Sequence, residues 1–204
     1  MAESDAAPDS HSSRSPVDRR ARPVDDGYPI VVRLAGRRVV VVGGGNIALR
    51  KATGLVESGA AVTVISPQII DGFDALDGVA MVRRAYESSD VEGAWLVVAA
   101  TNDAAVQQQI FDDGQRLGVF VNAVDDPDRC SFILPAVARR GPVIVAVSTQ
   151  GRSPALAGQL RDLLAAALPD NLETITDQVW QRRREMQARG ESTEDVAWPD
   201  LLDP

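Results

Sequence analysis

The side chains best suited to metal or redox chemistry are almost missing from this sequence of 204 residues. It holds one cysteine, Cys130, and one histidine, His11. A single cysteine can form neither a disulfide within the chain nor a cysteine cluster for zinc or iron–sulfur. We therefore expect no metal site built on His or Cys in the folded part. Any metal chemistry would use carboxylates, or ligands that a substrate brings.

Charged side chains that could take part in catalysis or binding are concentrated between residues 125 and 152. Three aspartates stand close together, at positions 125, 126 and 128. Four arginines follow them: Arg129, Arg139, Arg140 and Arg152. A carboxylate can act as a general base, and an arginine can pair with carboxylate groups. From spacing alone, Asp125 could equally be a solvated turn residue, and each arginine could be an ordinary surface residue.

A glycine-rich turn stands between an apolar run and a helical pattern. Residues 38–42 read Arg-Val-Val-Val-Val, and three glycines follow at 43–45. The run suits a strand that is buried on both faces. Gly43, Gly45 and Ala48 then occupy the three fingerprint positions of a dinucleotide-binding unit, whose helix start would meet a pyrophosphate. The bland alternative is a tight turn that binds nothing.

The end of the second expected strand departs from the usual dinucleotide-binding pattern. Such units often carry an Asp or Glu there for the ribose hydroxyls. Here the chain reads Ile-Ser-Pro-Gln at 65–68, and the first acid is Asp71. No arginine is clearly placed for a 2′-phosphate, so the residues leave NAD and NADP open. Ser66 and Gln68 could still hydrogen-bond a ribose.

The order of expected elements indicates an open α/β sheet. Helical patterns cover about 47–57 and 104–117, and extended patterns cover 38–42, 61–66, 79–84, 95–100 and 119–122. A β-α-β unit with so short a crossover should be parallel and right-handed. Ligands of such sheets bind beyond the carboxyl ends of the strands. That rule points to four places: Gly43–Ile47, Ser66–Gln68, Ala100–Asp103 (with Thr101 as a cofactor contact) and Asn122–Asp126.

The pattern changes after residue 127. An extended segment at 131–138, a turn at 139–142 and a strand at 143–148 predict an antiparallel pair. Helices are expected over 154–168, where Ser153 fits the N-cap, and over 171–189. We expect a disordered tail at 1–27, a Rossmann-like domain at 28–127, an antiparallel segment for dimerisation and substrate at 128–152, and a helical segment at 153–204.

Charge and hydropathy restrict the partners and the location. The formal net charge is −8, which makes nucleic acid an unfavourable partner. No apolar run approaches the roughly 18 to 20 residues of a membrane helix, and the N-terminal residues lack the apolar core of a secretory signal. We expect a cytoplasmic protein that associates with neither nucleic acid nor a membrane.

Four sequence blocks, taken in order, resemble the precorrin-2 dehydrogenase / sirohydrochlorin ferrochelatase family, which also forms the N-terminal half of siroheme synthase. The blocks are VVGGGNIALRK at 41–51, AATND at 99–103, VNAVD at 121–125, and SFILP at 131–135 together with VAVSTQGRSP at 145–154. The first block alone is shared by many dehydrogenases, whereas all four in order are specific.

The resemblance implies an activity and a set of site residues. NAD would accept a hydride from precorrin-2 to give sirohydrochlorin, and some family members then insert Fe²⁺ as a substrate to give siroheme. Asp125 matches the family's important aspartate. Asn46 and Ile47 match its NAD contacts at the first turn, and Pro67 and Gln68 match those after the second strand. The family binds NAD without an acid at that strand end.

The resemblance also implies partners. The family's segments after the nucleotide-binding unit pair two chains, so we expect a homodimer. Uroporphyrinogen methylation would come from a separate methyltransferase. Because precorrin-2 is a polycarboxylate, the four arginines and Ser148 are candidate substrate contacts, although Ser148 could be structural. Lys51, the sole lysine, is expected on the exposed side of the first helix.

A non-catalytic alternative remains open at this point. A Rossmann module that senses NAD, and recruits a partner through its acidic tails, would share the glycine turn. It would bind NAD without turning over any tetrapyrrole.

Overall fold

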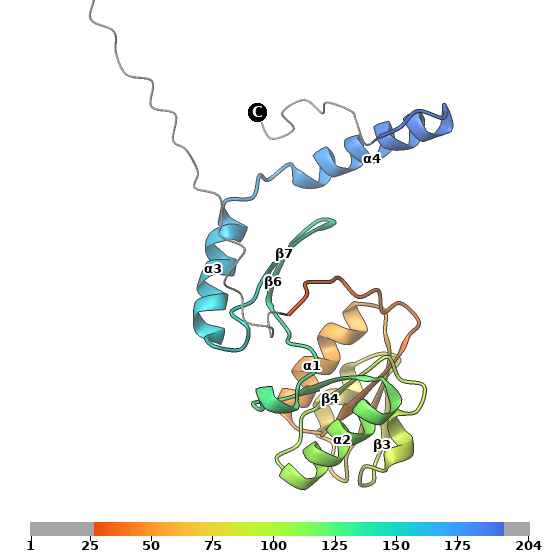
Figure 1. Cartoon of the computed structure of the whole chain (residues 1–204), viewed down its shortest axis with the longest axis vertical. Helices are drawn as coiled ribbons and strands as arrows, with labels where there is room; N and C mark the ends of the chain where they lie inside the picture. Colours follow the sequence, from red (N-terminus) through yellow and green to blue (C-terminus); the bar gives the residue numbers. More distant parts are fainter. Residues whose placement is uncertain (1–26, 194–204) are drawn as a thin grey trace, which may run out of the picture.

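The computed structural model describes residues 27–193. The predicted tail therefore lies outside the described residues, apart from Gly27, as do residues 194–204. Figure 1 shows a sheet region with helices on both faces, and a β-hairpin and two further helices beyond it. Between residues 27 and 193, none of the helices is long and apolar enough to span a membrane.

Five parallel strands form the larger sheet in the order β3-β2-β1-β4-β5. They are β1 (Arg38–Val42), β2 (Ala61–Ile65), β3 (Ala80–Val82), β4 (Leu96–Ala99) and β5 (Phe120–Ala123). Helix α1 (Asn46–Glu57) joins β1 to β2, and α2 (Ala104–Leu117) joins β4 to β5. Short 3-10 turns lie at η1 (Asp71–Ala75), η2 (Ser88–Val91) and η3 (Pro127–Arg129). The expected Rossmann-like parallel sheet is confirmed.

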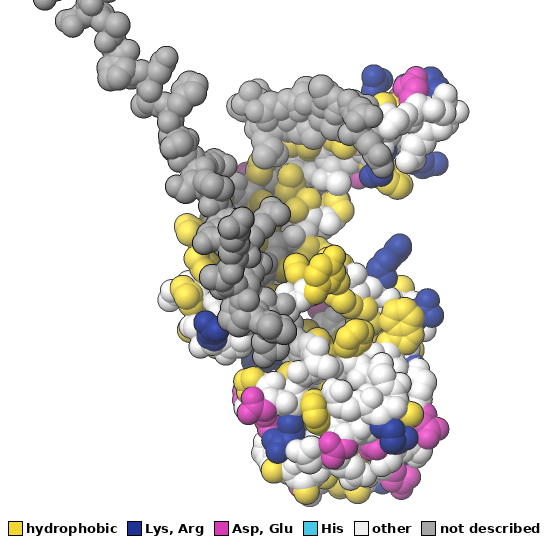
Figure 2. All heavy atoms as spheres, viewed as in Figure 1, with side chains coloured by type: hydrophobic (Ala, Val, Ile, Leu, Met, Phe, Trp, Pro, Cys, Tyr) yellow, Lys and Arg dark blue, Asp and Glu magenta, His cyan; other side chains and the backbone are white. Residues whose placement is uncertain are grey.

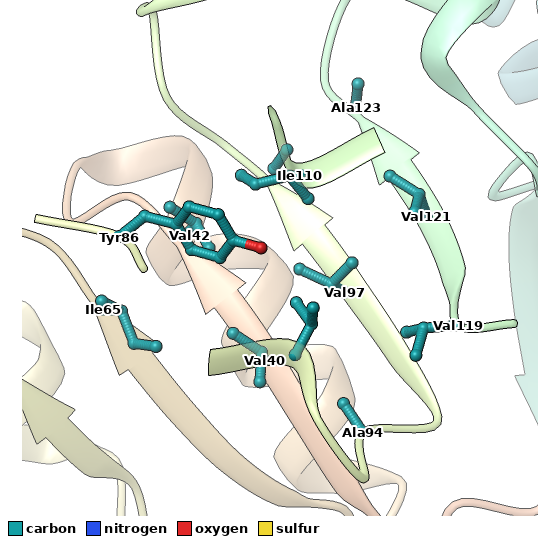
Figure 3. Close-up of a cluster of buried hydrophobic side chains, with 12 residues drawn as sticks. Val40, Val42, Ile65, Tyr86, Ala94, Val97, Ile110, Val119, Val121 and Ala123 are labelled. Atoms are coloured by element: carbon teal, nitrogen blue, oxygen red, sulfur yellow. The ribbon is translucent and has the colours of Figure 1, made fainter. Parts of the chain in front are cut away.

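The strands are apolar on both sides because a helix covers each face. Val40, Val42 and Val97 pack with Ile110 of α2 in one buried cluster, part of which Figure 3 shows. Their neighbours Val39 and Val41 belong to a second cluster with Ala48 and Ala52 of α1. Successive side chains of β1 thus point alternately into two buried clusters, which is why its apolar run is unbroken.

Local sequence accounts for the helix ends. Asp103 caps α2 by accepting from the backbone N–H groups of Ala105 (2.9 Å) and Val106 (3.2 Å). Gly118, at the C-cap of α2, adopts a left-handed conformation with φ of 69°. Glycine tolerates that conformation without strain. These two residues fix where α2 begins and ends at the sheet edges.

The C-terminal region consists of a hairpin and two helices. Its elements are β6 (Ala136–Arg140), β7 (Val143–Val147), α3 (Pro154–Ala166) and α4 (Leu172–Ala188). β6 and β7 are antiparallel, as predicted, with Ala138 opposite Val145. Ser153 caps α3 by accepting from the N–H of Leu156. The turn was predicted too long: Arg139 and Arg140 belong to β6, because both residues pair with β7.

Candidate functional site

A hollow opens at the carboxyl edge of the large sheet, where β1, β4 and β5 end. Its volume is about 260 Å³. The residues that line it come from the start of α1, the loop from β4 to α2 and the loop after β5: Ile47, Ala100, Thr101, Asn102, Gln107, Val124, Asp125 and Asp126. Three of the four places predicted from the strand ends therefore meet at one site.

The three glycine positions differ in whether the surrounding structure leaves room for a side chain. Gly43 has φ of 127°, and a Cβ there would run into the carbonyl of Ala100. A Cβ on Gly44 would overlap the carbonyl of Gln68. A Cβ on Gly45 would meet no protein atom within 4 Å. The protein's own backbone therefore requires the first two glycines, whereas the third leaves open space beside the helix start.

That open space fits a dinucleotide. Gly45 is the N-cap of α1, and no side chain caps the helix. The first N–H groups of a helix lack partners inside the helix and attract anions. Ala48, one turn later, is fully buried against the sheet, as close helix–strand packing requires. The residues present thus suit the pyrophosphate of NAD, with Asn46 and Ile47 exposed at the same turn.

The fourth predicted place lies against the glycine turn. The backbone N–H of Ile70 donates to the carbonyl of Gly44 over 3.0 Å, which holds the loop after β2 beside the turn. Pro67 and Gln68 are exposed there. Arg83, which follows β3, donates through Nη1 to the carbonyl of Ile69 over 3.0 Å. Arg83 could not be identified from the sequence, because the sequence of β3 does not indicate which strand it pairs with.

A second missed residue supports the β4 loop. Nε2 of Gln107 donates to the carbonyl of Thr101 over 2.7 Å. Gln107 is buried although it is polar, and this bond satisfies it. A signal existed in the sequence, since Gln107 stands four residues after the predicted cap Asp103 and so falls in the first turn of α2. The bond holds Thr101 at the hollow, where it was predicted.

Asp125 lies on the rim of the hollow, directly after β5. Its side chain is exposed, and its backbone adopts a left-handed φ of 60°. Aspartate tolerates this region better than most residues, and the turn places Asp125 on the same hollow as Thr101 and Ile47. The geometry is compatible with a general base that faces a bound substrate.

The expectation of an exposed Lys51 is wrong, because Lys51 is half-buried. Burial lowers the pKa of Lys51 from its ordinary value, and Arg50 adds to this; the charge of Asp125 and the thiol of Cys130 oppose the shift. The lysine therefore shares an electrostatic environment with Asp125. The sequence could not show this, since the two residues belong to α1 and to the loop after β5.

Two of the predicted substrate arginines are engaged by protein partners. Arg129 donates from Nε to Oε1 of Gln108 over 2.7 Å and forms an ion pair with Asp126. Arg140 bonds the carbonyl of Leu168 and pairs with Asp170 over 2.9 Å. These contacts tie the arginines to α2 and to the α3–α4 connection, respectively. Their role toward a substrate stays a prediction.

The other candidates of this group are exposed. Arg139 lies on the face of the hairpin opposite to Arg140, because neighbours in a strand alternate. Ser148 accepts from the N–H of Gln150 over 3.0 Å. Arg152 follows Gly151, where an added Cβ would lie 4.0 Å from Cγ of Pro127 in η3. The loop that carries Ser148 and Arg152 therefore passes beside the segment that follows Asp125.

Known proteins resemble the chain over most of the described region. Residues 30–136, more than half of the chain, match the sequence model of the family described as "Putative NAD(P)-binding". Siroheme synthase 2 of Aeromonas salmonicida (strain A449) is 42% identical over 154 residues, which cover 74% of this chain and 32% of that protein. Siroheme synthase of Citrobacter koseri is 41% identical over 161 residues, covering 78% and 35%.

A solved structure extends the likeness to the fold. The structure titled "SirC, precorrin-2 dehydrogenase" is 28% identical, with a TM-score of 0.65, and the match covers 84% of this chain and 83% of that one. The chain spans about a third of the length of the siroheme synthases that it matches. The resemblance drawn from the four blocks is confirmed. On the match to residues 30–136, the chain belongs to this NAD(P)-binding family.

Proposed function

We propose that the chain is an NAD-dependent dehydrogenase that oxidises precorrin-2 to sirohydrochlorin. The observation that carries the proposal is the shared hollow: Asp125 and the start of α1 line the same cavity. The substrate is inferred from the relatives named siroheme synthase and from the structure titled precorrin-2 dehydrogenase. The siroheme synthases supply the pathway, siroheme biosynthesis.

The reaction removes one hydride and one proton from precorrin-2. When bound, NAD⁺ supplies the hydride acceptor, so that the products are sirohydrochlorin, NADH and a proton. The first N–H groups of α1 would hold the pyrophosphate, and Pro67, Gln68 and Thr101 would border the cofactor. Asp125 is the general base in this proposal, because it lines the hollow and a carboxylate can take the proton.

The substrate would lie between Asp125 and the loop of residues 148–152. Precorrin-2 carries several carboxylates, so guanidinium groups are suited to hold it. Arg139 and Arg152 are exposed and make the stronger candidates. Arg129 and Arg140 would have to leave, or share, their present partners. Ser148 sits at the entrance of the same loop.

A second copy of the chain would complete the assembly. Large apolar side chains are exposed on the outer face of the hairpin and along α3: Val137, Ile144, Leu156, Leu160, Leu163 and Leu164. In Figure 2 hydrophobic side chains are visible over the C-terminal elements, whereas the visible part of the sheet region shows mostly backbone and other side chains, with scattered charged residues. Such a surface is typical of a protein–protein interface. We propose a homodimer that buries it.

Turnover of precorrin-2 tests the proposal directly. Incubation of the protein with precorrin-2 and NAD⁺ should produce NADH and sirohydrochlorin in equal molar amounts. The absorbance of each product measures its amount. NAD⁺ binding without turnover would instead support the sensing module and would refute the proposed enzyme.

Fe²⁺ insertion is a separate prediction from the family resemblance. Here Fe²⁺ is a substrate, and Asp125 could also accept the pyrrole protons that chelation releases. Anaerobic incubation of sirohydrochlorin with Fe²⁺, with and without the protein, measures this step. Equal rates in the two samples would show that the chain lacks the chelatase activity.

A further inference from the structure

The ends of β2 and β3 lie side by side at the carboxyl edge of the large sheet. The strands are parallel, and Val82 of β3 pairs with Ile65 of β2. The next residue of β2, Ser66, donates its backbone N–H to the carbonyl of Val82 over 3.1 Å. Arg83 therefore begins at the level of Ser66, one strand away.

Arg83 reaches back over the loop that follows β2. Its Nη1 donates to the carbonyl of Ile69 over 3.0 Å. The residue is exposed, and within residues 27–193 it forms no ion pair. Its neighbour Arg84 differs, because both of its terminal nitrogens bond the carboxylate of Asp90 at 2.7 and 2.6 Å. Arg83 thus keeps positive charge and hydrogen-bond donors for a ligand at this edge.

The loop under Arg83 is the place where a dinucleotide-binding unit holds the adenine ribose. In that fold an Asp or Glu at the end of the second strand selects the free 2′-hydroxyl of NAD, and a nearby Arg accommodates the 2′-phosphate of NADP. Residues 66–68 are Ser-Pro-Gln and contain no acid. The first acid of the segment, Asp71, stands in η1 beyond the Ile69 carbonyl that Arg83 bonds.

The same loop is fixed next to the pyrophosphate turn. Gly44 accepts a hydrogen bond from the N–H of Ile70, and its missing side chain lets the Gln68 carbonyl approach. A nucleotide whose phosphates lie at the start of α1 would therefore carry its ribose toward Ser66 and Gln68. The ribose 2′ position would face the strand end from which Arg83 extends.

We propose that this edge is a binding site for a 2′-phosphate, so that the chain binds NADP as well as NAD, with Arg83 as the residue that determines it. The inference rests on the cofactor site of the proposed function and adds a second nucleotide to it. Arg83 supplies a charge-assisted contact to the phosphate, Ser66 and Gln68 supply neutral donors, and no carboxylate at 66–68 repels it.

Adenosine 2′,5′-bisphosphate and adenosine 5′-monophosphate isolate this contact, because they differ only by the 2′-phosphate. Titration calorimetry at low salt should give the bisphosphate an affinity about tenfold higher for the wild-type protein. Arg83→Gln should remove that preference and leave the affinity for the monophosphate within about twofold. Arg161→Gln, which deletes an equal charge on α3, should keep the preference. The preference should also weaken as salt is added.

Each outcome decides the proposal. Equal binding of the two nucleotides to the wild-type protein would overturn the 2′-phosphate site, and a preference that survives Arg83→Gln would overturn the role of Arg83. If NAD⁺ supports turnover of precorrin-2 and the bisphosphate shows no preference, only this inference fails. If neither nucleotide nor NAD⁺ binds, the cofactor site of the proposed function fails as well.

Discussion

The parallel sheet and the C-terminal region use apolar side chains in opposite ways. In the sheet region the strands are covered on both faces, and most of their side chains are buried. Beyond residue 133, the buried apolar residues are Ala157, Leu172 and Met186 among the residues that the structure describes. There α3 covers only one face of the hairpin, and large side chains remain exposed on the other.

The difference shows which part of the chain forms its own core. A parallel sheet with helices on both faces buries its apolar side chains within one chain. A two-stranded hairpin with one helix buries too little apolar surface to be stable alone. We infer that the first region builds the cofactor pocket from one chain, and that the second depends on a partner. Four predictions test this contrast.

The largest expected effect is on assembly. Leu160→Glu combined with Leu163→Glu places two charges on the exposed apolar face of α3. Burial of a leucine contributes about 1.5–3 kcal/mol, so the loss of two should convert the dimer to monomers in sedimentation. Gln159→Glu, which adds one negative charge at an exposed polar position of the same helix, should leave the dimer intact. A wild-type protein that sediments as a monomer would contradict the prediction.

A second prediction concerns the carboxylate at the sheet edge. Asp125→Asn removes the proposed base without changing the size of the side chain. We expect kcat for precorrin-2 oxidation to fall by about 100-fold or more, with the affinity for NAD⁺ unchanged in calorimetry. Asp128→Asn, at an exposed position nearby, serves as the control. Normal turnover by the Asp125 variant would remove Asp125 from the mechanism.

A third prediction compares two glycines of the turn in the sheet region. Gly44→Ala forces a Cβ into the Gln68 carbonyl and should lower the free energy of unfolding by about 1–3 kcal/mol. Gly45→Ala meets no protein atom and should cost less than about 1 kcal/mol. Its Cβ would instead enter the space left for the cofactor, so NAD⁺ affinity should fall by about tenfold. Urea unfolding and calorimetry measure the two effects; the same loss of NAD⁺ affinity in both variants, after correction for folding, would refute the distinction.

The smallest expected effect is the acid sensitivity of the sheet region. Burial opposes ionisation of Asp90, but hydrogen bonds from Arg84 and from the Glu87 backbone outweigh it and hold the pKa of Asp90 below its ordinary value. A carboxyl whose pKa is lowered by folding stabilises the protein above its unfolded pKa of about 4, and that contribution is lost as the pH falls further.

Urea unfolding at pH 6 and at pH 3 measures this contribution. Asp90→Asn should destabilise the protein by about 1–3 kcal/mol at pH 6, because Arg84 and the Glu87 N–H lose a charged partner. The variant should also lose less stability than the wild type between pH 6 and pH 3. Asp112→Asn, at an exposed position of α2, is the control. An equal loss in both proteins across this range would show that Asp90 does not contribute.

Local patterns predicted much of the fold and part of the site. The valine run, the three glycines and the cap at Asp103 act over a few residues, so their structures could be anticipated from neighbours in sequence. The rule that ligands bind at the carboxyl ends of strands predicted that Ile47, Thr101 and Asp125 lie at one edge of the sheet. The predicted third strand was too long, since the chain leaves β3 after Val82.

What the sequence alone determined is the glycine turn, the parallel sheet and the edge at which the site forms, because these follow from local conformation and from the handedness of β-α-β units. The tertiary structure decided which distant residues meet there. Pairing of β3 beside β2 brought Arg83 to the ribose end of the site, and folding of α1 against the sheet brought Lys51 within the electrostatic reach of Asp125. Such encounters depend on strand order and packing, which no local pattern encodes.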